Sequence, residues 1–205
     1  MRNLANILFI VVSISVVALG SAVEVRRLEF NEISFSGSDR WYESSVEIEV
    51  SRDVDDRLRK DADFLDDLDV ELFLGIEIRE EGRPQFEFYR SVAQLVSLER
   101  GEHVVRFYLP PEVVKRDLVK GEPHSFLVRL SRNGELLEEV VSDRLERPQV
   151  KQSFIARATK DGQRNEGVLK TQDMTPFSSE YPRSTPSLKR AHGQIALEQS
   201  KGAGK

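Results

Sequence analysis

Carboxylates are the most concentrated reactive side chains in this 205-residue chain, and their densest run lies between residues 53 and 69. Calcium is the ion that suits hard oxygen ligands at this density. The run lacks the central glycine and the final glutamate of an EF-hand loop, however, and Arg57, Arg59 and Lys60 are interleaved with it. The pattern therefore favours a solvated acidic connection and predicts no metal site. The aspartates concerned are Asp53, Asp55, Asp56, Asp61, Asp63, Asp66, Asp67 and Asp69.

Histidine and cysteine, the side chains that most often serve as nucleophiles, bases and metal ligands, are scarce. The chain has three histidines and no cysteine. His103, His124 and His192 lack metal-ligand spacing, and neither an H-E-x-x-H nor a G-x-S-x-G pattern occurs. The lack of cysteine excludes disulfides and thiolate sites. Acidic residues are too abundant for a glycosidase pair to be recognised among them. We therefore expect no enzyme and no cofactor.

Charge is unevenly distributed about a net charge of −5. Residues 23–148 are strongly acidic, whereas residues 149–205 are basic. An acidic body repels phosphate backbones, so nucleic acid is not expected as its partner. The basic tail could contact anionic lipid, nucleic acid or the acidic body itself.

The amino-terminal segment has the pattern of an export signal. Arg2 is followed by the apolar stretch 7–19, and Gly20-Ser21-Ala22 offers the small residues that a signal peptidase prefers. The pattern favours a signal peptide over residues 1–22, cleaved after Ala22. An uncleaved membrane anchor is the alternative, because no charge occurs from residue 3 to residue 23. Together with the absence of cysteine and of an Asn-x-Ser/Thr sequon, this predicts an exported protein of the bacterial periplasm or envelope.

Short runs of alternating apolar and polar residues recur through the body, with turn signals between them. Alternation of this kind predicts strands with one buried face. About seven strands in this length predict a mainly β fold, an immunoglobulin-like antiparallel β-sandwich over residues 23–148. The runs are 24–36, 46–50, 70–79, 86–88, 91–99, 103–109, 126–131 and 135–142; of these, 91–99 also fits a helix. The single Trp41 suits a sandwich core or rim.

Three local features refine this prediction. Asn133-Gly134 predicts a tight hairpin turn, because both residues tolerate positive φ. In the first run, Phe30 and Ile33 are out of phase, and one extra residue, a β-bulge, would return both to the core. Pro110-Pro111-Glu112 predicts a short helix ending near residue 117.

From residue 150 the alternation stops, and residues 149–205 are predicted to be a largely irregular, disordered tail. One aromatic and proline patch within it, residues 175–182, is a candidate docking element for a partner. Its residues are Pro176, Phe177, Tyr181 and Pro182. Proline reduces the entropy that a peptide loses on binding. The alternative is an arm that packs back onto its own sandwich.

The layout resembles small immunoglobulin-like envelope proteins associated with bacterial type IV pilus or type II secretion machinery. The resemblance rests on the signal segment, the run Asp69-Val70-Glu71-Leu72-Phe73-Leu74, the Leu109-Pro110-Pro111 turn and the element Thr175-Pro176-Phe177. It implies a non-catalytic component or accessory of an envelope assembly.

Three functions remain open at this point. The first is a non-enzymatic scaffolding module that binds an envelope protein. The second is a carbohydrate- or ligand-binding β-sandwich, which exposed aromatic residues would favour. The third is a hydrolase with an unrecognised carboxylate pair. The composition favours the first.

Overall fold

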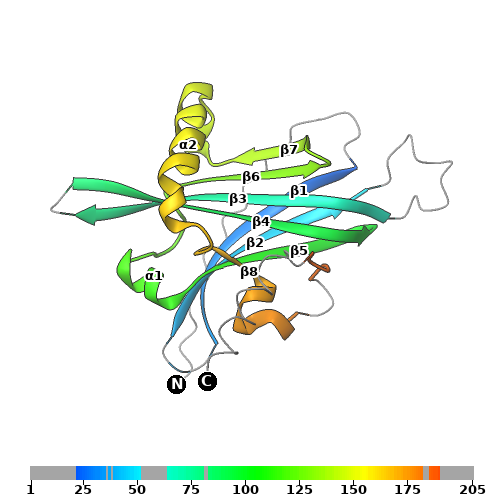
Figure 1. Ribbon diagram of the computed structural model, residues 1–205, viewed down its shortest axis with the longest axis horizontal. Coiled ribbons are helices and arrows are strands. Elements are labelled where there is room, and N and C mark those ends of the chain that lie inside the picture. Colours follow the sequence, from blue (N-terminus) through cyan, green and yellow to red (C-terminus); the bar gives the residue numbers. More distant parts are fainter. Residues whose placement is uncertain are drawn as a thin grey trace, which may run out of the picture.

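Two antiparallel sheets stack face to face in the computed structural model, which describes residues 22–35, 37, 39–51, 64–80, 83–181 and 185–189 (Figure 1). Sheet A has the strand order β1-β2-β5-β8, and sheet B has the order β4-β3-β6-β7. The chain crosses between the sheets after β2, β4, β5 and β7. This is a Greek-key arrangement of the immunoglobulin-like kind, with the fourth strand paired beside the third. The predicted mainly β sandwich is confirmed.

The strands are of unequal length. Sheet A contains β1 (Val23–Ser34), β2 (Arg40–Val50), β5 (Gly101–Leu109) and the short β8 (Lys170–Thr171). Sheet B contains β3 (Phe64–Glu80), β4 (Arg83–Glu99), β6 (Ser125–Arg132) and β7 (Glu135–Val141). Two helices, α1 (Pro111–Arg116) and α2 (Pro148–Lys160), accompany short 3-10 turns at 143–145, 161–165, 172–174 and 176–179.

The core lies between the sheets and is built by the alternation read from the sequence. Val46 and Ile48 on β2 are fully buried, as are Val70, Leu72 and Leu74 on β3. Because successive side chains of a strand point to opposite faces, the intervening positions face outward. The run 91–99 belongs to the continuous strand β4, which pairs with β3 along its length, so the helical alternative is excluded.

The local turn and helix predictions are also confirmed. Asn133 and Gly134 have φ of 52° and 80° and join β6 to β7. Positive φ at both central residues is what this kind of hairpin turn requires. Helix α1 starts with Pro111 in its first turn, has Glu112 beside it, and ends at Arg116.

The bulge in β1 lies elsewhere than predicted. The register shifts between Val25 and Arg27, and pairing then continues without interruption to Ser34 opposite Arg40. Ile33 therefore stays on the outer face of sheet A, opposite Trp41. The change of phase between Phe30 and Ile33 is therefore not caused by a bulge. It reflects a second apolar surface on the outer face of the sheet.

The prediction that the sandwich ends at residue 148 and is followed by an irregular tail is wrong for residues 149–181 and 185–189. Helix α2 lies across the outer face of sheet B (Figure 1). Its Phe154 and Ala158 are buried against Phe73, Phe88 and Leu127. A helix with so few apolar residues is stabilised by this one packed face, because most of its other side chains are polar.

Gly75 on β3 allows α2 to approach the sheet. A Cβ atom at this position would lie 2.5 Å from Ser125 Oγ and 3.0 Å from Phe154 Cε2. Any larger side chain would therefore push the helix away from β3 and β6.

After α2 the chain crosses to sheet A as a segment that we call the strap, residues 170–181 and 185–189. Its first two residues form β8, which pairs with β5 at Phe107 and Tyr108. Its last residues pair with β4 instead, through Val96 N to Ser187 O at 3.0 Å and Lys189 N to Gln94 O at 2.7 Å. The strap thus covers the edges of both sheets on one side of the sandwich.

Some sequence predictions fall on residues outside the described part. These are the signal segment up to residue 21, the acidic residues 53–63, Pro182, and the tail from residue 190, which contains His192. Among the described helices none is long and apolar enough to cross a membrane.

Candidate functional site

The four residues of the predicted docking element have different environments. Phe177 is only 2% exposed, Pro176 is exposed, and Tyr181 is 46% exposed. Pro182 lies outside the described residues. A docking role that needs Phe177 on the surface is therefore wrong, because this side chain packs on its own sandwich. The structure shows the alternative, an arm folded back on the domain.

An aromatic cluster on the outer face of sheet A holds Phe177. Its ring stacks on Tyr108, with centroids 4.8 Å apart and planes 10° from parallel. Trp41 and Phe35 meet it edge to face, at 5.6 Å and 5.4 Å. Offset stacked and edge-to-face pairs are the favourable aromatic geometries. The cluster explains why Phe35 and Trp41 are apolar although they lie outside the core.

A buried polar pair lies under the same segment. The Tyr108 hydroxyl donates to Glu43 Oε2 at 2.9 Å, and Glu43 is only 7% exposed. Burial raises the pKa of the Glu43 carboxyl, and the hydrogen bond from Tyr108 offsets part of that effect. Burial and the neighbouring Glu43 carboxylate likewise raise the pKa of Tyr108. The pair is structural, because the strap separates it from solvent.

Gln172 and Arg106 fix the strap in place. The Gln172 side-chain amide donates to Phe177 O at 3.0 Å and to Glu180 O at 2.7 Å. Its oxygen accepts from the Thr185 hydroxyl at 3.1 Å. The Arg106 guanidinium lies 4.2 Å from the centre of the Tyr181 ring. This side of the sandwich, where β5 and β4 would otherwise be edge strands, is closed by the chain itself.

The opposite side is open. There β1 and β7 are the outermost strands of their sheets among the described residues. A hydrogen bond joins them, from Val25 N to Glu138 Oε2 at 2.6 Å. A groove of about 470 Å³ lies between β1, β7 and the loop that joins α1 to β6.

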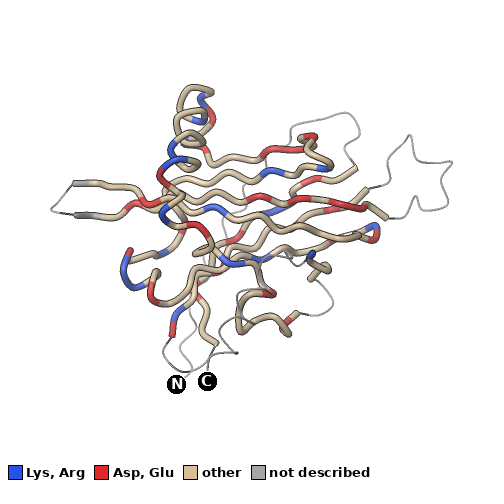
Figure 2. The backbone as a smooth tube through the Cα atoms, viewed as in Figure 1, with Lys and Arg blue, Asp and Glu red and all other residues tan. Residues whose placement is uncertain are grey.

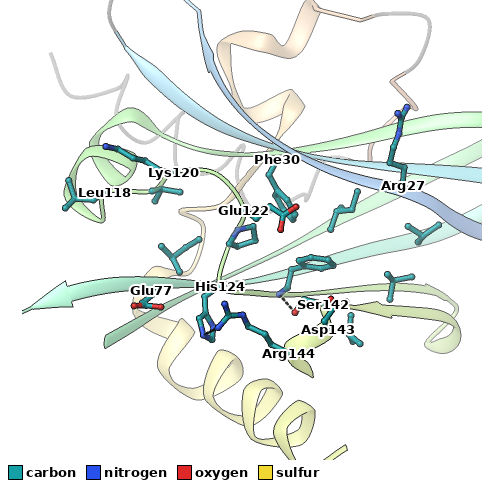
Figure 3. A pocket seen from close by; sticks show the side chains of 18 of the residues that line it. Arg27, Phe30, Glu77, Leu118, Lys120, Glu122, His124, Ser142, Asp143 and Arg144 are labelled. Atoms are coloured by element: carbon teal, nitrogen blue, oxygen red, sulfur yellow. Dashed lines mark hydrogen bonds between the residues drawn. The ribbon is translucent and has the colours of Figure 1, made fainter. Parts of the chain in front are cut away.

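The groove has an apolar floor and a charged rim. The floor consists of core-facing residues that the sheets leave partly uncovered, Leu28, Phe30, Phe126 and Val140. Leu118, Lys120, Glu122, His124 and Arg144 surround it (Figure 3). Arg27, although part of the lining, points away from the groove in this view and forms an ion pair with Glu47 on the outer face of sheet A (Figure 3).

His124 and Arg144 lie against each other at the sheet B end of the rim. Arg144 Nη1 lies 2.8 Å from His124 Nε2, and the imidazole packs against Phe86 with centroids 4.6 Å apart. Because an arginine can only donate, Nε2 accepts this hydrogen bond. Burial, with a contribution from the Arg144 charge, lowers the pKa of His124. The neutral imidazole is therefore the form that this contact stabilises.

The loop at the other end of the rim is rigid. Asp117, at the end of α1, is buried and accepts from the Tyr89 hydroxyl and from Arg116 Nε at 2.6 Å. The Tyr42 hydroxyl donates to Gly121 O at 2.8 Å. Burial and the Asp117 carboxylate raise the pKa of Tyr89, so its hydroxyl stays a donor. These buried bonds position Leu118 and Lys120 at the mouth of the groove.

The remaining chemistry candidates do not come together in the described part of the chain. His103 lies on β5 of sheet A and contacts Glu99 O at 2.6 Å, whereas His124 precedes β6 of sheet B. The two histidines therefore do not meet across paired strands. In the described ranges no three His, Asp or Glu side chains are placed to hold a metal ion.

Sequence reasoning missed the groove, because its walls come from four distant segments. These lie within residues 25–30, 76–77, 118–126 and 140–144, and they carry no shared motif. The one local signal is Leu118, a leucine just after a short helix where glycine is usual.

Comparison with known proteins supports the fold. No protein-family model matches the chain, and no curated protein matches it. A crystal structure of a protein from Akkermansia muciniphila superposes with a TM-score of 0.61 at 17% sequence identity. The match covers 82% of this chain and 93% of that one. At this identity the similarity concerns the fold alone.

Proposed function

We propose that this chain is a non-enzymatic, exported protein-binding module of a bacterial cell envelope, and that the groove between β1 and β7 is its binding surface. One observation carries the proposal. The chain covers the edges of β5 and β4 with its own strap, yet β1 and β7 flank a groove into which the core opens. Edge strands beside an exposed apolar surface are a common site of protein association.

The export part of the proposal rests on the segment before β1. The first strand begins at Val23, the residue that would follow cleavage after Ala22. An accessory role in a pilus or secretion assembly is the finer form of the proposal, and it rests on the resemblance of the layout.

Charge is consistent with a protein partner. Acidic residues recur along the strands of both sheets (Figure 2). Many of them form ladders of ion pairs on the outer faces, such as Arg90 to Glu71 at 2.6 Å and Arg129 to Glu139 at 2.8 Å. Exposed pairs of this kind contribute little to stability, but they keep these faces hydrated. The groove differs from them in its apolar floor.

The proposal is tested by site-specific photo-crosslinking with the full-length protein in the cells that produce it. A photoreactive residue replaces Leu118 at the groove, and in a matched control it replaces Phe64, which is 52% exposed at the start of β3. We expect a discrete protein adduct from position 118 and none from position 64. Equal adducts from both positions, or none from position 118, would remove the groove as a binding surface.

A carbohydrate-binding role is the second candidate, and a second hollow favours it. A cavity of about 490 Å³ is lined by Phe35, Trp41, Pro111 and Pro176, with Asp39, Glu112 and Lys115 at its edge. Aromatic rings beside carboxylates can bind sugars. A glycan array separates the two roles, because Trp41→Ala would abolish glycan binding and leave crosslinking at position 118 unchanged.

A further inference from the structure

His124 and Arg144 join two walls of the groove. His124 lies on the loop between α1 and β6, and Arg144 lies in the turn that follows β7. The 2.8 Å hydrogen bond from Arg144 Nη1 to His124 Nε2 therefore connects segments that are 20 residues apart in the chain (Figure 3). We call this contact the latch.

The latch requires a neutral imidazole. An arginine side chain only donates, so Nε2 keeps its lone pair and the ring proton lies on Nδ1. Nδ1 is buried and has no hydrogen-bond partner among the described residues. The ring also packs against Phe86, with centroids 4.6 Å apart. Because Nδ1 forms no bond, the orientation of the imidazole depends on the latch and on this packing.

Charged groups of both signs lie around the ring. They are Arg144 and Asp143 of the turn after β7, Glu77 of β3, Arg157 of α2 and Glu122 of the loop itself. Glu77 is the cross-strand partner of Phe86, so its carboxylate and the imidazole lie on the same face of sheet B. Glu77 is also close enough to favour the charged form of the imidazole. A protonated ring would therefore have an anion near it.

Protonation of the imidazole is incompatible with the latch. Both nitrogens of an imidazolium donate, so Nε2 would no longer accept from Arg144. Two positive groups would then lie 2.8 Å apart, and like charges this close repel each other. Burial and the Arg144 charge lower the pKa of His124, whereas Glu77 acts in the opposite direction. Acid should therefore break the contact.

An occupant of the groove would strengthen this effect. His124 lines the groove and is partly exposed. A partner that covers the rim removes more water from the imidazole, and loss of water disfavours the charged form. Linkage is reciprocal, so a partner that disfavours protonation of His124 is itself bound less tightly once the ring is protonated.

We propose that the latch is an acid-sensitive switch, closed while the imidazole of His124 is neutral and released when the ring is protonated. On release Arg144 leaves the ring, the imidazolium turns towards Glu77, and the partner dissociates from the groove. The statement about the partner rests on the proposed function, whereas the latch itself does not.

The latch is tested on the full mature chain by NMR of the histidine ring nitrogens, from about pH 8 down to about pH 4. The His124 signals are identified by their loss in His124→Gln. We expect the neutral ring to carry its proton on Nδ1 and to titrate with a midpoint below about 6.5. Arg144→Gln keeps a donor for Nε2 but removes the charge, so it should raise the midpoint.

Three results would overturn the latch. They are a neutral ring with its proton on Nε2, a midpoint at or above about 6.5, and a midpoint that Arg144→Gln leaves unchanged.

The effect on the partner is tested by photo-crosslinking at position 118 in envelope extracts, buffered from about pH 7.5 down to about pH 5. We expect the yield of the adduct to fall with acid by up to about tenfold per pH unit, the limit for one linked proton. In His124→Gln the amide oxygen still accepts from Arg144 but does not titrate, so the yield should stay constant. His103→Gln, on β5 of sheet A, is the matched control and should behave as the parent protein does.

The outcomes separate the latch from the proposed function. The same acid loss of the adduct in His124→Gln and in the parent would show that another group responds to acid, and it would refute the switch. An adduct in the parent that acid does not diminish would refute it as well, but would leave the protein-binding function standing. If position 118 forms no adduct at any pH, the proposed function fails, and the NMR titration alone decides whether the latch exists.

Discussion

Phe177→Ala is the sharpest test of the strap as part of the folded unit. The ring is 2% exposed and lies among Tyr108, Trp41 and Phe35, so its removal leaves a cavity in an aromatic cluster. Truncation of a buried phenylalanine costs about 3–5 kcal/mol. We take the lower limit, because the ring lies on an outer face. About 3 kcal/mol corresponds to a fall in Tm of roughly 6–12 °C for a domain of this size.

Trp41 is a built-in probe for this experiment, because the chain has one tryptophan and it contacts Phe177. Unfolding in denaturant is followed by tryptophan fluorescence and, separately, by circular dichroism of the sheets. Coincident transitions would show that strap and sandwich unfold together. Tyr181→Ala is the control, since this ring is 46% exposed and its contact with Arg106 is worth about 1 kcal/mol or less. A loss under about 1 kcal/mol for Phe177→Ala would refute the reasoning.

Gly75→Ala should destabilise the protein by about 1–3 kcal/mol in a denaturant titration, because the new Cβ would lie 2.5 Å from Ser125 Oγ. Gly162→Ala is the control, since the nearest atom to its Cβ would be 3.6 Å away. Its free energy of unfolding should change by less than about 0.5 kcal/mol. Glu43→Gln should raise stability at neutral pH. Burial raises the folded-state pKa of Glu43, so the folded protein holds this proton more tightly than the unfolded chain. The resulting stabilisation is present at acid pH and is lost as the pH rises through the folded-state pKa. The free energy of unfolding should therefore fall less between acid and neutral pH in Glu43→Gln than in the parent protein. Export should yield a protein that begins at Val23, and Ala22→Arg should leave the precursor uncleaved; amino-terminal sequencing of the fractionated protein decides this, and an intact terminus in the parent would favour the anchor.

The sheets could be predicted from the sequence because each strand buries one face. Alternation over Val70, Leu72 and Leu74 reports that burial directly, and Asn133-Gly134 reports the backbone geometry of one turn. Both signals come from residues that are neighbours in the chain, so they can be recognised in the sequence without knowledge of the tertiary structure.

The outer coverings could not be predicted in the same way. Phe35 and Trp41 contact Phe177 of the strap on the outer face of sheet A, and the pattern of one strand cannot distinguish a second apolar face from a bulge. Helix α2 buries little more than Phe154 and Ala158, so its apolar signal is weak. Pro148 in its first turn and the four-residue spacing of that pair were the available signs.

The groove depended on tertiary structure altogether. Leu28, Leu118 and Val140 belong to different parts of the chain, and their proximity follows from the packing of the two sheets and of the loop after α1. Sequence alone gave no reason to group them.

The strap also has a consequence for the order of folding. Its pairing joins Tyr108 to Lys170 and Leu95 to Leu188, so neither edge can be covered before the last part of the chain has left the ribosome. Until then β4 and β5 each have one open edge, and the aromatic face of sheet A is uncovered, a state prone to pairing between molecules. Aggregation during folding should therefore depend on how quickly residues 170–189 arrive, and a chaperone that shields strand edges would act in that interval.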